Sequence, residues 1–221
     1  MTAEESQAAP APHTHHKFGF RERLELWSAL LMAAATVATA YSAYESTRWS
    51  GEQSTQFTQA GASRTESAKA NTAAAAQITI DASLFTQVAV AYSQGNKRGQ
   101  ELVEGFFRNE FKPAYREWLA MKPLKNPDAP ATPFSLDSYQ LDKQKESERL
   151  EAQATAHFDA GRDANQNGDN YVLATIFFAA VLFFAGVATK FTSDRVVAMT
   201  LGIGTVVFLT GLVRLMTLPF H

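Results

Sequence analysis

The sequence of residues 27–44 is WSALLMAAATVATAYSAY, which contains no charged side chain. Two further stretches share this property: residues 171–189 (YVLATIFFAAVLFFAGVAT) and residues 196–213 (VVAMTLGIGTVVFLTGLV). Each approaches the roughly 20 residues that an α-helix needs to cross about 30 Å of hydrocarbon. A buried core helix is the alternative for one such stretch, but three of them favour an all-α integral membrane protein. We therefore predict three transmembrane helices, within residues 17–44, 171–189 and 196–215.

The segments around these helices are polar. Residues 1–16 contain two prolines among many Ala, Ser and Gln residues, which predicts a disordered tail. We assign residues 45–170 to an extramembrane helical domain, 190–195 to a short turn and 216–221 to a C-terminal tail. The basic residues before the first stretch resemble the start of a signal peptide. Because that stretch is long and lacks a clear cleavage site, we interpret it as a retained anchor.

Lysine and arginine near the membrane ends predict the orientation, because these residues concentrate on the cytoplasmic side. Five of them flank the amino terminus and the 190–195 turn: Lys17, Arg21, Arg23, Lys190 and Arg195. Three lie at the opposite ends: Arg48, Arg162 and Arg214. This bias places the amino terminus and the turn in the cytoplasm. The 45–170 domain is then outside, which means the periplasm if the protein is bacterial, or else the extracellular side.

Aromatic residues occur where interfacial anchors are expected, at the ends of the predicted spans. These residues are Trp27, Tyr41, Tyr44, Trp49 and Tyr171.

Proline is absent between Pro12 and Pro113 and again between Pro133 and Pro219. Each of the first two spans should therefore continue as one helix into the aqueous domain, and the simplest assembly is a long antiparallel, coiled-coil-like hairpin. A small residue recurs at every seventh position of the first helix, which predicts a helix-packing seam. The seam residues are Ala33, Ala40, Thr47, Ser54, Gly61, Ala68, Ala75, Ala82 and Ala89.

Glycines mark similar faces on the other two helices. Gly161 and Gly168 in the returning helix each cost about 1 kcal/mol of helix stability relative to Ala, which is understandable where another backbone presses close. Gly202, with Gly204 and Gly211, predicts a close-packing face on the third span.

The connection between the two long helices contains turn residues and a cluster of aromatics. Residues 101–121 predict a short amphipathic helix that Pro113 kinks or splits, and the four prolines within 122–133 predict a loop. Four aromatic residues stand out: Phe106, Phe107, Phe111 and Trp118. They either pack on the tips of the two long helices or form a docking surface for a protein or lipid.

The residues give no support for catalysis or for a cofactor. There is no cysteine, no phosphate-binding loop, no dinucleotide fingerprint and no zinc-protease motif. The tail histidines (His13, His15 and His16) lack a carboxylate partner, so we predict no metal site, and His157 is expected to be a hydrogen-bonded core residue. A net charge of −2 without a basic stripe argues against a nucleic-acid partner.

Residues 40–53, AYSAYESTRWSGEQ, resemble a segment of small uncharacterised bacterial inner-membrane proteins in which an anchor helix continues into a helical extension and a pair of membrane helices follows. That family has no assigned activity. The resemblance implies a bacterial inner-membrane location and no catalytic role.

These observations favour a non-enzymatic membrane scaffold or accessory subunit, either a homo-oligomer or bound to a partner membrane protein. The alternative is an oligomeric channel or transport component whose pore is lined by hydroxyl residues such as Thr36 and Thr205. A sensory role is less favoured because the chain offers no cytoplasmic signalling domain, and an enzyme is least favoured.

Overall fold

A computed structural model describes residues 19–220, which contain five α-helices, one short 3-10 helix and no strand. The predicted tail and its three histidines lie outside this range. The elements are α1 (Phe20–Ser93), α2 (Lys97–Glu104), α3 (Phe111–Ala120), η1 (Pro133–Ser135), α4 (Asp142–Ala188) and α5 (Asp194–Thr217). Three helices, α1, α4 and α5, are long and apolar enough to cross a membrane. The predicted all-α class with three such helices is therefore confirmed.

The chain divides into two compact units. Within the described residues, unit 1 comprises 19–51 and 164–220, and unit 2 comprises 52–163. Helices α1 and α4 contribute to both units because α1 has 74 residues and α4 has 47, far more than a bilayer needs.

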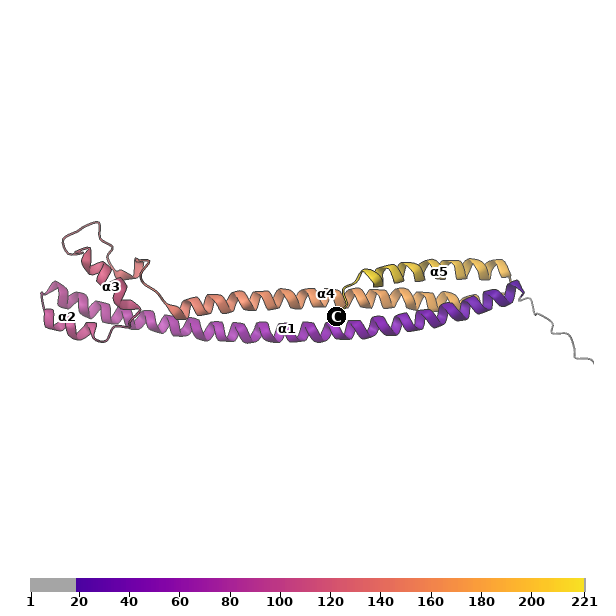
Figure 1. Ribbon diagram of the computed structural model, residues 1–221, viewed down its shortest axis with the longest axis horizontal. Coiled ribbons are helices and arrows are strands. Elements are labelled where there is room, and N and C mark those ends of the chain that lie inside the picture. The colour runs from indigo at the N-terminus through magenta and orange to yellow at the C-terminus, as the bar shows by residue number, and fades with distance from the viewer. Residues whose placement is uncertain (1–18, 221) are drawn as a thin grey trace, which may run out of the picture. The chain divides into compact units, whose positions relative to one another are not determined.

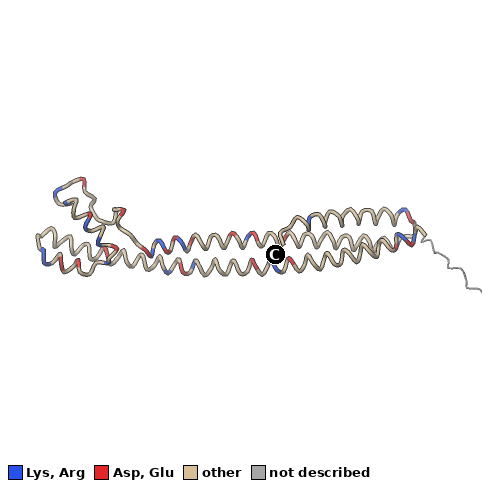
Figure 2. Tube along the Cα trace, viewed as in Figure 1, with Lys and Arg blue, Asp and Glu red and all other residues tan. Residues whose placement is uncertain are grey.

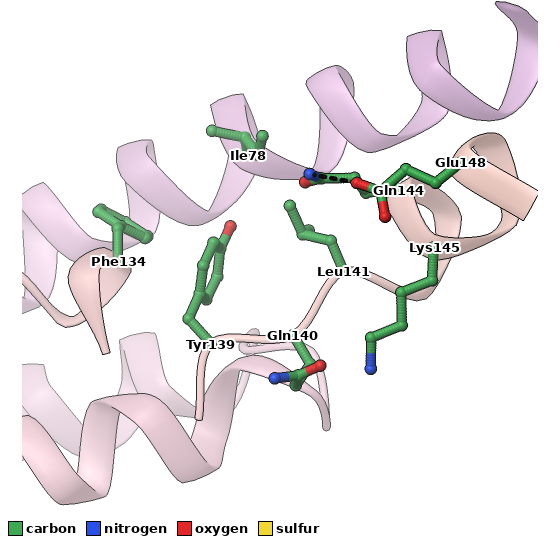
Figure 3. Close-up of a pocket in the computed structure, with 8 residues that line it drawn as sticks. All are labelled: Ile78, Phe134, Tyr139, Gln140, Leu141, Gln144, Lys145 and Glu148. Carbon is green, nitrogen blue, oxygen red and sulfur yellow. Dashed lines mark hydrogen bonds between the residues drawn. The ribbon is translucent and has the colours of Figure 1, made fainter. Parts of the chain in front are cut away.

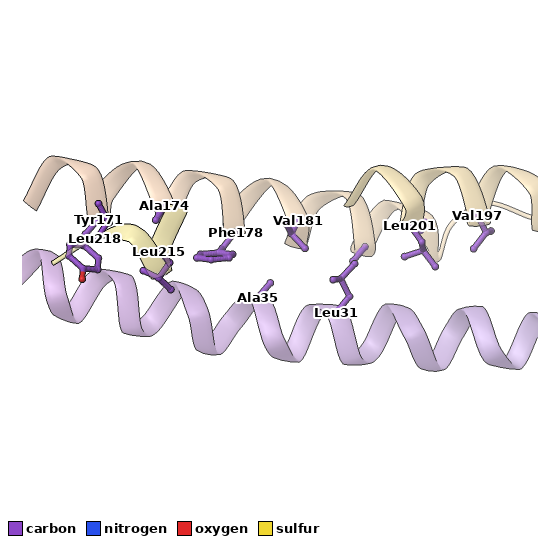
Figure 4. Close-up of a cluster of buried hydrophobic side chains, with 12 residues drawn as sticks. Leu31, Ala35, Tyr171, Ala174, Phe178, Val181, Val197, Leu201, Leu215 and Leu218 are labelled. Carbon is purple, nitrogen blue, oxygen red and sulfur yellow. The ribbon is translucent and has the colours of Figure 1, made fainter. Parts of the chain in front are cut away.

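Unit 1 is a bundle of α1, α4 and α5 (Figure 1). Helix α4 runs antiparallel to α1, so that the hydroxyl of Ser28 donates to the carbonyl of Ala185 over 3.1 Å. The core between the helices contains Leu31, Phe178 and Leu201 (Figure 4). The charged residues of this unit gather toward the helix ends and leave the middle of the bundle uncharged (Figure 2). That distribution suits a hydrocarbon environment.

In unit 2, α1 and α4 again lie antiparallel, and the hydroxyl of Ser67 donates to the carbonyl of Ser147 over 3.0 Å. Helix α1 ends in a tight turn at Gly95, whose φ of +68° is readily adopted only by glycine. The side chain of Asn96 then caps α2 by accepting from the backbone N–H of Gly99 over 3.0 Å.

The split within the predicted 101–121 helix occurs earlier than Pro113. Helix α2 ends at Glu104, and α3 begins at Phe111. Pro113 lies in the first turn of α3, where its missing N–H has no intrahelical partner to lose. Proline therefore permits the helix here instead of breaking it. The predicted proline-rich loop at 122–133 contains no helix before η1.

Candidate interaction surface

The face of α1 that packs on α4 differs from the predicted small-residue seam. In unit 1 it is formed by Ser28, Leu31, Ala35 and Ser42, all buried. In unit 2 the buried positions of α1 alongside the first half of α4 are Ala60, Ser67, Ala70 and Ala74.

The predicted seam residues lie on the outer side of α1. Ala33, Ala40, Thr47, Ser54, Gly61, Ala68 and Ala75 are exposed, whereas Ala82 and Ala89 are partly buried. The inward series is displaced from them by two positions, from Ala33 to Ala35 and from Ala68 to Ala70. Two residues correspond to about 200° around an α-helix, so the two series face nearly opposite directions. The seam does not join α1 to α4, and we call it the outer face of α1.

The predicted glycines of α4 lie on its α1-facing side. A Cβ built on Gly161 would be 2.6 Å from the ring of Phe57, and one built on Gly168 would be 3.6 Å from Cβ of Trp49. Close to Gly161, Nδ1 of His157 donates to Oε1 of Gln56 over 2.7 Å. His157 is therefore a hydrogen-bonded interhelical residue.

On α5 the glycines that pack closely are Gly204 and Gly211, and not Gly202. Gly202 is exposed, with no atom within 4 Å of a built Cβ. A Cβ built on Gly204 would be 3.4 Å from Phe184 and 3.5 Å from Leu31, and one built on Gly211 would be 3.1 Å from both Phe177 and Phe178. Gly204 and Gly211 lie about 180–200° around α5 from Gly202, so the face of α5 that meets the bundle is opposite Gly202.

An apolar groove of about 620 Å³ lies along the outside of unit 1, between α1 and α5. Ala33 of the outer face and Val37, one turn farther along the same side of α1, line it on one side, and Phe208 and Leu212 line it on the other. We count Val37 with the outer face from here on. Val37 is 70% exposed. The groove is therefore open at the surface of the bundle.

The hydroxyls proposed as pore-lining groups are bonded to their own helices. Thr36 donates to the carbonyl of Met32 over 2.8 Å, and Thr205 donates to that of Leu201 over 2.8 Å. Ser42, Thr200 and Thr210 do the same with the residue four positions earlier. This arrangement satisfies the hydroxyls without a water-filled path.

The predicted interfacial aromatics fall into two groups. Trp27, Tyr41 and Tyr44 are exposed and Trp49 is half-buried. In contrast, Tyr171 is fully buried, and its hydroxyl donates to the carbonyl of Pro219 over 3.2 Å. Tyr171 is therefore a core residue that holds the end of α5, because the chain after α5 folds over it.

The N-terminal end of α1 is clamped to the α4–α5 turn. The guanidinium of Arg21 donates to Asp194 over 3.0 Å and to the carbonyl of Phe191 over 2.8 Å. Hydrogen bonding to Asp194 raises the pKa of Arg21. These contacts bring together the two basic segments on which the predicted orientation depends.

In unit 2 the aromatic residues considered as a docking surface are mostly core residues. Phe107, Phe111 and Trp118 are buried, and only Phe106 is exposed, at 76%. Trp118 meets Phe85 of α1 edge to face at 5.1 Å, and its indole N–H donates to the carbonyl of Pro130 over 2.8 Å. Phe107, Phe111 and Trp118 therefore belong to an aromatic core that includes Phe85 of α1, and they do not form the predicted docking surface.

A buried charge in this core was missed at the sequence level. Asp81 of α1 is 0% exposed and accepts from Arg108 through Nη2 at 2.6 Å and Nε at 3.1 Å. The hydroxyl of Tyr139 also donates to Asp81, over 3.0 Å. The only sequence signal is that Asp81 is the sole charged residue between Lys69 and Lys97.

Two members of this network, Arg108 and Tyr139, have a shifted pKa. Hydrogen bonding to Asp81 raises the pKa of Arg108. Burial, followed by the charge of Asp81, raises the pKa of Tyr139 to about 12. Arg108 therefore stays charged and Tyr139 stays neutral across the physiological pH range. The network joins α1 to the segment before α3 and to the segment between η1 and α4.

Beside Tyr139, a groove of about 510 Å³ lies where α4 begins (Figure 3). Its apolar lining comes from Ile78, Phe134 and Leu141. Gln144 and Glu148 line it as well and are hydrogen-bonded to each other over 3.0 Å.

Among the described residues, no group of three or more His, Cys, Asp or Glu side chains could hold a metal ion. Comparison with protein-family models, with curated proteins and with solved structures gives no match to this chain.

Proposed function

We propose that this protein is a non-enzymatic, multi-pass membrane scaffold or accessory subunit that self-associates through the outer face of α1. The observation that carries the proposal is the exposure of the small-residue series, from Ala33 to Ala75, on a helix whose other side is already packed. In lipid, helices associate through close packing of small residues because hydrophobicity does not drive them together. Ala33, together with the groove it lines beside α5, offers such a contact within unit 1.

The proposed location is a bacterial inner membrane, with residues 45–170 in the periplasm. The Arg21–Asp194 clamp supports a shared side for the start of α1 and the α4–α5 turn. Single cysteines at Glu22 and Arg195 should react with a membrane-impermeant maleimide only after the cells are opened, because both residues are then cytoplasmic. A cysteine at Ser135 should react in intact spheroplasts. Labelling of all three from the same side would refute this topology.

The oligomeric state tests the function directly. The protein extracted in mild detergent and measured by mass photometry should have a mass of at least two chains. Val37→Trp places a bulky side chain on the outer face without touching the α4-facing side, and it should reduce the oligomer. Met199→Trp is the matched control, because Met199 is 69% exposed and lies on α5 outside the groove. A protein that stays monomeric, without a co-purifying partner, contradicts the proposal.

A further inference from the structure

Outside the apolar span, threonine recurs at every seventh residue on the exposed side of α1. The positions are Thr58, Thr65, Thr72, Thr79 and Thr86, and all are exposed. Each hydroxyl donates to the backbone carbonyl four residues earlier, over 2.8–3.0 Å. With the hydroxyl bonded to its own helix, the methyl group is what each threonine offers to a neighbouring molecule.

The acceptors of these bonds are the outer-face residues of unit 2, namely Ser54, Gly61, Ala68, Ala75 and Ala82. Threonines and small residues therefore alternate four and three positions apart from Ser54 to Thr86 without a slip. This is the a/d pattern of a left-handed coiled coil, with threonine at a and a small residue at d.

The a and d positions of this face hold no charged residue, and the nearest charged residues, Arg64 and Lys69, flank it at the g and e positions. Lys69 pairs with Glu66 over 2.7 Å, and Arg64 lies over the ring of Phe158 at 5.2 Å. Asp81 points into the core of unit 2. A helix face that meets only water is normally rich in charge. The threonine face therefore has the composition of a face that is covered.

The seven-residue repeat indicates what covers it. A strict heptad face keeps its register only against another helix that supercoils with it. Within the chain, α4 already occupies the opposite side of α1, through Ala60, Ser67 and Ala74. A second copy of α1 carries the matching repeat.

We propose that the threonine face of α1 in unit 2 pairs with the same face of a second copy, with the two helices parallel and in register. This inference rests on the proposed function, since insertion in one membrane in one orientation makes the two α1 helices parallel. Each threonine then meets the same threonine of the other copy, and the small residues allow the backbones to approach closely.

The absence of native cysteine makes this pairing measurable in the full-length protein in its membrane. We choose Ala68→Cys and Thr72→Cys on the face, and Gln59→Cys and Glu66→Cys as exposed controls about 130° away around α1. In a parallel, in-register pair the face positions come within the roughly 4.4–6.8 Å Cα separation of a disulfide, so we expect them to cross-link about ten times faster than the controls.

The outcomes separate this inference from the proposed function. Faster cross-linking at Ala68→Cys and Thr72→Cys, giving a product of two chains, supports the pairing. An oligomer by mass photometry whose four cysteines react at equal rates, or not at all, overturns the pairing and leaves self-association standing. A monomer by mass photometry overturns both. Linkage to a different protein at these positions, identified by mass spectrometry, overturns the pairing by showing another occupant.

Discussion

Replacing Asp81 with alanine should selectively loosen the aromatic core of unit 2. The carboxylate is fully buried and accepts three hydrogen bonds from the Arg108 guanidinium and one from Tyr139. Its removal leaves a guanidinium and a phenol without their main acceptor. Breaking a buried ion pair from one side typically costs about 3–5 kcal/mol. Because the Arg108 side chain is 19% exposed and also contacts Glu110 at 3.3 Å, we expect the lower end, about 3 kcal/mol.

Hydrogen–deuterium exchange of the full-length protein can localise this loss. A loss of about 3 kcal/mol in the stability of unit 2 corresponds to roughly a hundredfold faster exchange at those amides that exchange only when unit 2 unfolds. The effect should appear in α3 and at the end of α1 but not in α5, which belongs to unit 1. Asp137→Ala, an exposed aspartate in the same unit, is the matched control and should stay within about 0.5 kcal/mol of the wild type.

A second substitution separates the unpaired charge from the lost contacts. Adding Arg108→Ala to Asp81→Ala removes the stranded guanidinium, so the double variant should be no less stable than Asp81→Ala alone. Acceleration of less than about fivefold in α3 for Asp81→Ala would refute the assigned role of the pair. Equal acceleration in α5 would refute its confinement to unit 2.

Two further predictions concern α4 and the pH dependence of unit 2. Gly168→Ala should stabilise the protein by up to about 1 kcal/mol through helix propensity, because its new Cβ meets only ordinary contacts. Gly161→Ala should be less stable than Gly168→Ala, because its Cβ meets the Phe57 ring at 2.6 Å. Thermal unfolding in detergent measures both variants, and equal effects would contradict the packing described at Gly161. Tyr139 has a raised folded-state pKa, so its stabilising contribution is complete below about pH 10 and is lost as the pH rises through about 12. Thermal unfolding between these pH values should show a smaller loss of stability in Tyr139→Phe than in the wild type, and identical profiles would exclude Tyr139 as the source.

The three apolar helices were predictable because charge exclusion is a property of a whole segment. Residues 27–44 need only lack charge to be recognised, whatever they pack against. The continuation of α1 past the apolar stretch was predictable for a similar reason, since one proline would have interrupted it.

The face of α1 that packs on α4 was not predictable from residue size. Alanine is so frequent in α1 that small residues repeat every seven positions on more than one side of the helix. The face that packs on α4 also contains Leu31 and Gln56, and a search for uniformly small residues passes over these. Choosing between the faces requires knowing which side chains of α4 lie opposite, such as His157 against Gln56.

The site residues missed or misplaced depend on tertiary partners. Asp81 is a single charge in an uncharged stretch, and nothing local shows that Arg108 and Tyr139 will reach it. Tyr171 has the position of an interfacial anchor, but the chain after α5 returns to cover it. Residue composition identifies the end of a span, but it does not identify which neighbouring segment packs around a residue there.

The residue types on the outer face of α1 change in the way that a change of solvent would require. Leu30 and Val37 occupy the seven-residue register within the apolar span, and Thr65 and Thr72 occupy the same register farther along the helix. A lipid-facing surface needs no small residues at alternate positions, and a water-facing surface needs no avoidance of charge. A partner helix requires both, with apolar knobs where the surroundings are lipid and bonded threonines where they are water. The composition of this face is what the proposed association of α1 with another chain predicts, and neither solvent alone requires it.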